Sequence, residues 1–193
     1  MHLTSFFTLF AAATILGAPT EPIEPTGITS LAADVLDQGD GFYLASYNEA
    51  GVLDVAFTPI AKLETTSPAA QLTTRATHTL GKRETVCSGR SSVALGTLDD
   101  ANRQLASNAA AQGNYGKSSW GWVHRDAETS YFCNYQANFL TYQLIIDMHT
   151  VISGRCTQAG YGYDRRTNGG GAQDLSVGRT WRGDNFCDGN YHG

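Results

Sequence analysis

The strongest constraint on the fold of this chain is the position of its cysteines. Cys87, Cys133, Cys156 and Cys187 all follow residue 83, separated by 46, 23 and 31 positions. An even number of cysteines in a short segment is typical of disulfides in an extracellular domain. Zinc sites instead need closely paired ligands such as C-x-x-C. We therefore predict two disulfides and neither metal nor cofactor, with the three possible connectivities left open.

The N-terminus has the pattern of a secretory signal. Residues 3–16 read LTSFFTLFAAATIL, an uncharged apolar run closed by the small residues Gly17 and Ala18. This is the length of a signal-peptide core, and it falls short of the roughly 20 apolar residues that span a bilayer. The alternative is a buried core helix. The sequence thus predicts a signal peptide over 1–18 and a secreted, extracellular protein without a transmembrane anchor.

The next segment, 19–83, contains no cysteine and changes character along its length. Within it, 41–59 alternates apolar residues on both sides of Asn48–Gly51, which predicts a β-hairpin. Residues 64–80 are rich in Thr and Ser, as flexible linkers are. Because a lone hairpin is marginal in water, two interpretations stay open. The segment either pairs with the downstream domain as a small intramolecular chaperone, or it is a mostly unstructured propeptide.

A dibasic pair, Lys82-Arg83, ends this segment and is the kind of site that kexin-type secretory proteases cut. Its position between a linker and a cysteine-bearing domain predicts a propeptide over 19–83 and a mature domain over 84–193. Residues 1–83 carry eight acidic and four basic side chains, whereas 84–193 carry ten and nine. A nearly neutral mature domain argues against nucleic acid as a partner.

The mature domain has alternating helix and strand patterns. Helices are predicted over 97–112, with Thr97 as N-cap, and over 137–153, with Asn138 as N-cap. Strands are predicted at these ranges: 118–125 and 128–136, joined by Asp126-Ala127, and then 159–165 and 175–181. The order predicts an α+β fold, an α/β sandwich in which an antiparallel sheet of about four strands packs with two helices.

Three stretches carry a resemblance to a known family: TSYFCNYQ, LIIDMHTVISGRC and DLSVGRTW. With the order of elements over about 87–187, they resemble the killer-toxin-four fold of smut-fungus viral toxins and the related necrosis-inducing effectors of fungal plant pathogens. The resemblance implies an α/β sandwich and a secreted toxin or effector. It also implies that Cys87 pairs with Cys156 and Cys133 with Cys187. No position matches an active residue of the toxins, so none is carried over.

The best candidates for chemistry lie at the tip of the predicted hairpin. His124 and Glu128, on neighbouring strands, are candidates for an acid/base pair, and Arg125 or Arg179 for holding phosphate, as in small secreted ribonucleases. The alternative is a solvated turn with ordinary charges. His149 is a further candidate, but it lies on a helix that must bury one side, so it also fits a buried structural histidine.

Three functions remain open at this point. The first is a non-enzymatic toxin or effector that meets a surface protein or glycan of a target cell. The second is a small hydrolase or ribonuclease that uses His124 and Glu128. The third is a wall- or glycan-binding protein, because exposed rings on a sheet bind sugars. Packing is the alternative for at least two of the three tryptophans. A local basic cluster is also predicted from Arg165, Arg166, Arg179 and Arg182.

Overall fold

The computed structural model describes residues 33–63, 82–168 and 172–187. The predicted signal peptide and the Thr/Ser-rich linker lie outside the described residues. The helices are α1 (Ala33–Leu36), α2 (Ile60–Leu63), α3 (Leu95–Gln112) and α4 (Tyr142–Cys156). The strands are β1 (Gly41–Tyr47), β2 (Leu53–Pro59), β3 (Lys82–Ser91), β4 (Asn114–Tyr115), β5 (Ser119–Arg125), β6 (Glu128–Asn134), β7 (Asn138–Phe139), β8 (Gly160–Thr167) and β9 (Leu175–Trp181).

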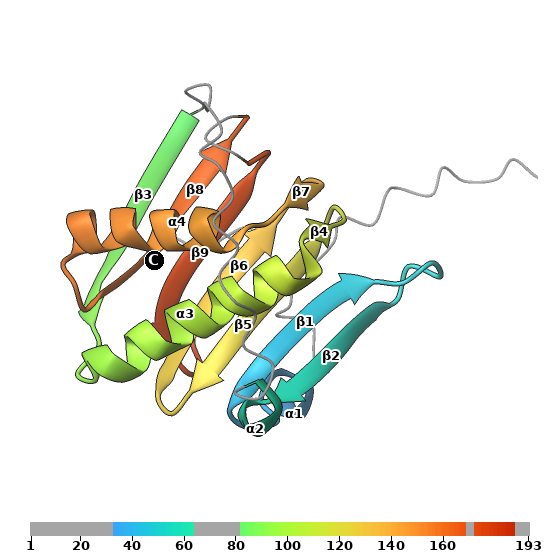
Figure 1. Cartoon of the computed structure of the whole chain (residues 1–193), viewed down its shortest axis with the longest axis horizontal. Coiled ribbons are helices and arrows are strands. Elements are labelled where there is room, and N and C mark those ends of the chain that lie inside the picture. Colours follow the sequence, from blue (N-terminus) through green and yellow to red (C-terminus); the bar gives the residue numbers. More distant parts are fainter. Residues whose placement is uncertain (1–32, 64–81, 169–171, 188–193) are drawn as a thin grey trace, which may run out of the picture.

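Seven of these strands form one antiparallel sheet in the order β2-β1-β5-β6-β9-β8-β3 (Figure 1). The predicted four strands are its centre, β5, β6, β9 and β8. The prediction of about four strands is wrong, because the hairpin β1–β2 extends the sheet beyond β5 and β3 extends it beyond β8. A separate two-stranded ladder, β4 with β7, and the short helices α1 and α2 were also not predicted. Strand β3 was not predicted, because its polar sequence, KRETVCSGRS, does not alternate apolar and polar residues.

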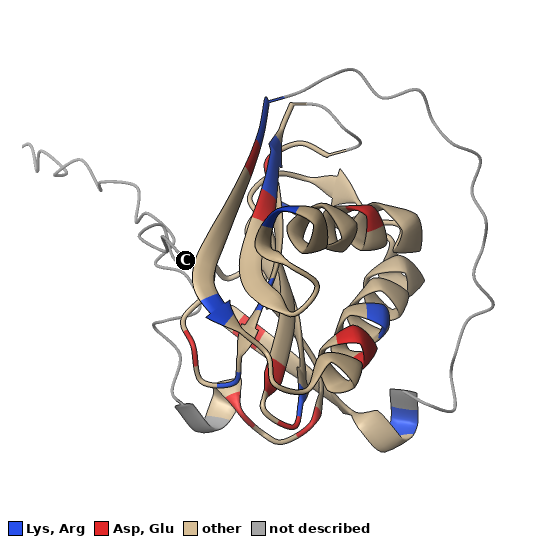
Figure 2. Ribbon diagram, turned by 90° about the vertical axis from the view of Figure 1, so that its left-hand side faces the viewer, with Lys and Arg blue, Asp and Glu red and all other residues tan. Residues whose placement is uncertain are grey.

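Both long helices lie on the same side of the sheet, as the edge-on view shows (Figure 2). Helix α3 begins at Leu95 and has Ala94 rather than Thr97 at its N-cap. Helix α4 is capped by Thr141, whose Oγ1 accepts the Leu144 N–H at 3.1 Å. Asn138, the predicted cap, belongs to β7 instead. Both helices therefore begin at a different residue from the one predicted, although their buried stripes are where the 3.6-residue period places them.

The pleat of the sheet separates the core into two clusters, one on each face. On the helix side, Val123 and Phe132 pack with the apolar faces of α3 and α4. On the opposite side, Trp122 and Tyr131 pack with Phe186 from the segment after β9. Both clusters include residues of β1, so the hairpin contributes to the core on both faces of the sheet.

Two disulfides join elements that are distant in sequence. Cys87 of β3 is bonded to Cys156 at the end of α4, which ties an edge strand to the helix layer. Cys133 of β6 is bonded to Cys187, which holds the segment after β9 against the face away from the helices. The two predicted disulfides are therefore present, and they join the pairs that the family resemblance implies. Each typically stabilises a domain by about 2–4 kcal/mol.

Candidate functional site

The structure does not bring His124 and Glu128 together. Across the β5–β6 pair, His124 is opposite Thr129, and Glu128 is opposite Arg125. Opposite residues share a face of a sheet, whereas successive residues alternate between faces. His124 therefore lies on the face of Trp122, and Glu128 lies on the helix side. A proton transfer between them would have to pass through the sheet, so the geometry does not form the predicted acid/base pair.

Glu128 serves as a buried acceptor, with a side chain that is 1% exposed. One carboxylate oxygen accepts the Ser92 hydroxyl at 2.6 Å, and the other accepts the Tyr161 hydroxyl at 2.9 Å. Ser92 in turn accepts the Ala94 N–H at 2.9 Å, just before α3 begins. Burial and this carboxylate raise the pKa of Tyr161 to about 12. Glu128 therefore links β6 to β8 and to the start of α3.

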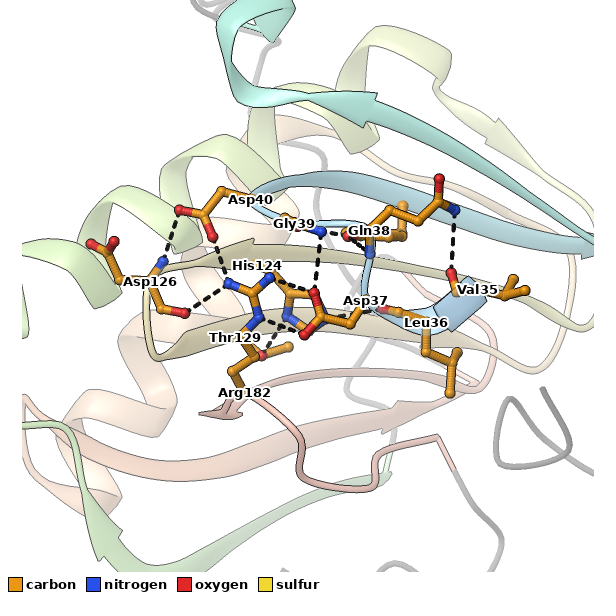
Figure 3. Close-up of polar contacts among 11 residues, drawn as sticks. Val35, Leu36, Asp37, Gln38, Gly39, Asp40, His124, Asp126, Thr129 and Arg182 are labelled. Atoms are coloured by element: carbon orange, nitrogen blue, oxygen red, sulfur yellow. Dashed lines mark hydrogen bonds and ion pairs between the residues drawn. The ribbon is translucent and has the colours of Figure 1, made fainter. Parts of the chain in front are cut away.

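His124 is buried against the segment that precedes β1 (Figure 3). Its Nε2 lies 3.2 Å from the backbone carbonyl of Leu36, and its Nδ1 lies 2.8 Å from the Thr129 hydroxyl. Because a carbonyl only accepts, the proton belongs on Nε2, and Thr129 donates to Nδ1. Burial, aided by the Arg182 cation, lowers the pKa of His124 to about 4. The ring is therefore neutral near pH 7 and both its nitrogens are engaged.

A cluster of charges surrounds this histidine and joins the N-terminal segment to the end of β9 (Figure 3). The Arg182 guanidinium donates to Asp37 through Nε at 2.8 Å and to Asp40 through Nη1 at 2.6 Å. Asp40 also accepts the backbone N–H of Asp126 at 3.0 Å. The hydrogen bond with Arg182 lowers the pKa of Asp37 to about 2. We call Asp37, Asp40, His124 and Arg182 the polar latch.

His149 has the structural environment that its place on α4 suggested. It is 4% exposed, and its Nε2 lies 3.1 Å from the hydroxyl of Ser130, which is completely buried. Burial, with a contribution from Arg179, lowers its pKa to about 3. Within the part of the chain that the structure describes, His149 Nδ1 has no hydrogen-bond partner. A serine enclosed in this way is out of reach of a substrate, so this pair does not resemble a catalytic dyad.

Arg179 is buried in the same layer and holds the turn after α4. Its guanidinium donates to the backbone carbonyls of Thr157, Gln158 and Gly160 at 2.8–3.0 Å, and to the Ser153 hydroxyl at 2.9 Å. Arg179, one of the two arginines predicted to hold phosphate, therefore has its donors occupied by the protein. The other three arginines of the predicted basic cluster each face a carboxylate: Asp174 for Arg165, Asp164 for Arg166, and both Asp37 and Asp40 for Arg182.

The dibasic pair lies within edge strand β3. Lys82 is opposite Thr167 and Arg83 is opposite Arg166 in the β3–β8 ladder. The Arg83 guanidinium also binds both oxygens of Asp164, at 3.0 and 3.1 Å from Nε, and the Asp164 side chain is completely buried. The bond after Arg83 is therefore part of a paired strand. A small pocket lined by Lys82, Glu84, Arg165 and Thr167 flanks it.

The tryptophans mostly serve packing. Trp120 and Trp122 are at most 2% exposed, while Trp181 is partly buried and lies under the guanidinium of Arg90 at 4.5 Å. Two of the three rings are thus unavailable as an exposed sugar platform. In residues 33–63, 82–168 and 172–187, no group of three or more His, Cys, Asp or Glu is arranged to hold a metal ion. None of the helices described has the length and apolar character needed to cross a membrane.

Sequence reasoning named Arg83 and Arg182 but missed the carboxylates that pair with them. Asp37 and Arg182 are 145 positions apart, and Arg83 and Asp164 are 81 apart. No motif or spacing links such pairs, because only the pairing order of the strands brings them together. The alternation of β1 was the one available signal, since it predicted a hairpin with a buried face.

Comparison with protein-family models, with curated proteins and with solved structures finds no match to this chain. The killer-toxin-four resemblance therefore stays a prediction from the pattern of elements.

Proposed function

We propose that this chain is the precursor of a secreted, toxin- or effector-like protein, and that the domain over 84–193 acts on other cells by binding rather than by catalysis. The observation that carries the proposal is the separation of His124 from Glu128 by the sheet. Each is held by hydrogen bonds within the protein, as structural polar groups are. This supports the binding role over the hydrolase.

The disulfides support an extracellular setting. Structural disulfides persist in oxidising compartments and are rare in the cytosol. Both bonds lie wholly within 84–193, the part expected to remain after the cut at Lys82-Arg83. Neither disulfide is therefore lost when the covalent link to the preceding segment is cut. The signal-like N-terminus and the dibasic pair complete the layout of a processed secreted protein.

The test has two parts, which are processing and action. The intact mass of the secreted product should correspond to a chain that begins at Glu84 and gains four hydrogen atoms when its two disulfides are reduced. Applied to fungal or plant cells, this product should cause growth arrest or necrosis. A secreted chain that retains residues 19–83, or a product without effect on either cell type, would contradict the proposal.

A variant separates binding from catalysis. His124→Gln should reduce the action on cells only in proportion to the loss of folded protein, measured by near-ultraviolet circular dichroism. Lys117→Gln, at an exposed position of the same domain, is the matched control. A fully folded His124→Gln protein that has lost a measurable hydrolytic turnover of RNA or glycan would instead support the enzyme.

A further inference from the structure

Strand β5 has one neighbour from each side of the predicted cut. It pairs with β6 on one side and with β1 on the other, where the ladder runs from Gly41 opposite His124 to Ser46 opposite Ser119. No disulfide among the described residues joins the hairpin to 84–193. After a cut at Arg83, β1 would therefore be held on β5 by non-covalent contacts alone.

The contact between β1 and β5 is made by aromatic side chains at alternate positions. The Tyr43 ring stacks on Trp122 with centroids 5.0 Å apart, and the Tyr47 ring meets Trp120 edge-on at 5.8 Å. Between them, Ala45 is completely buried opposite Trp120. On this face, β5 therefore accepts an extended segment whose successive side chains are an aromatic, a small and a second aromatic residue.

The polar latch sets where that segment begins. Arg182 binds Asp37 and Asp40, which come immediately before β1, and the Leu36 carbonyl meets His124. A segment that docks on β5 therefore gains an ion pair if it carries an acid about three residues before the first aromatic residue on the face toward Trp122, as Asp40 precedes Tyr43. The combined pattern is acid-x-x-aromatic-x-small-x-aromatic.

We propose that the edge of β5 is a strand-accepting site, which β1 occupies in the uncut chain and which an extended segment of a target protein with this pattern occupies in the processed domain. The inference rests on the proposed function for its target. A vacated edge presents a row of backbone N–H and C=O groups, and another backbone strand satisfies them best. For this reason the partner is a protein strand rather than a glycan.

An exchange experiment tests the site with the folded chain as starting material. The purified chain from residue 19 onward is cut with a kexin-type protease, and a fluorescein-labelled synthetic peptide of residues 33–63 is added. Fluorescence anisotropy should show saturable uptake of the peptide by cut protein. Uncut protein should show at least tenfold weaker uptake, because its tethered hairpin competes at a high effective concentration.

Peptide variants test the recognition pattern. Tyr43→Ala in the peptide should weaken binding at least tenfold, because this ring is completely buried against β5. Val52→Ala is the matched control in the hairpin turn, where the side chain is 59% exposed, and it should change binding less than twofold. Equal affinities for the two variant peptides would overturn the proposed pattern.

The remaining outcomes also decide the matter. Cut protein that never exchanges its hairpin, or that loses it and closes β5 as a dimer by native mass spectrometry, would overturn the site. If labelled mature domain binds target cells and excess peptide does not compete, the surface is not the one that meets the target, and the inference fails. Peptide uptake without any binding to cells would leave the strand-accepting site standing and would refute the proposed function.

Discussion

Two buried histidines predict that the folded chain loses stability in mild acid. In the fold the pKa is about 4 for His124 and about 3 for His149, whereas an unfolded histidine titrates near 6.5. The unfolded chain therefore binds protons at these sites as the pH falls below 6.5, while the folded chain does not. Since proton binding to the unfolded state favours unfolding, stability is full above pH 7 and declines toward pH 4.

The magnitude follows from the two pKa values. Between pH 8 and pH 5 each histidine should lower the free energy of unfolding by about 2 kcal/mol, and the pair by about 4 kcal/mol. Asp37 does not contribute to the change in stability between pH 8 and pH 5, because its pKa of about 2 keeps it ionised over this whole range. A loss of this size is a large fraction of the 5–15 kcal/mol that is typical of whole domains.

Urea unfolding at pH 8, 7, 6 and 5, followed by tryptophan fluorescence, measures the effect. His149→Phe should remove about half of the pH dependence, because it removes one of the two imidazoles whose pKa differs between the folded and the unfolded chain. Met148→Ala, on the same helix and completely buried, is the control: it should lower stability at every pH and leave the slope unchanged. A total change below 1 kcal/mol, or an unchanged slope in His149→Phe, would refute the reasoning.

Three further predictions concern the cut site, the disulfides and Glu128. Asp164→Asn removes the ion partner of Arg83, so a kexin-type protease should cut the folded chain several-fold faster by mass spectrometry, whereas Asp174→Asn, which affects Arg165, should not. Replacing both Cys133 and Cys187 by Ser should lower the free energy of unfolding by about 2–4 kcal/mol. An unchanged urea midpoint would show that this disulfide does not stabilise the domain. Glu128→Gln weakens the acceptor of two buried hydroxyl groups and should cost about 1.5–3 kcal/mol. The same change at exposed Glu49 should cost almost nothing, and equal losses at the two positions would contradict the buried role.

Local pattern predicted the elements better than their assembly. The apolar period located the helices α3 and α4, and alternation located β5, β6, β8 and β9. The helix starts were misplaced because Thr97 and Asn138 have the chemistry of caps, while the N-caps belong to Ala94 and Thr141. The four-strand prediction omitted β3. This edge strand is held by its pairing with β8 and by its disulfide to α4, and contacts between distant residues leave no local sequence pattern.

The candidate site shows the same division. Alternation within β5 already indicated that His124 and Arg125 face opposite sides, but the residue opposite each of them depends on the register with β6. That register places Thr129 against His124 and sends Glu128 to the helix side. A shift by one residue would have joined the pair, because side chains alternate with a period of two.

The sequence by itself predicted two disulfides after residue 83, a hairpin over 41–59 as one of two open interpretations, and alternating helices and strands in the cysteine-bearing part. These features depend on the spacing of residues along the chain, which can be read from the sequence alone. Only the tertiary structure decided that the hairpin lies on β5, that Arg182 meets Asp37 and Asp40, and that Arg83 is held by Asp164. Such contacts join residues far apart in the chain, and they exist only once the strands have taken their order in the sheet.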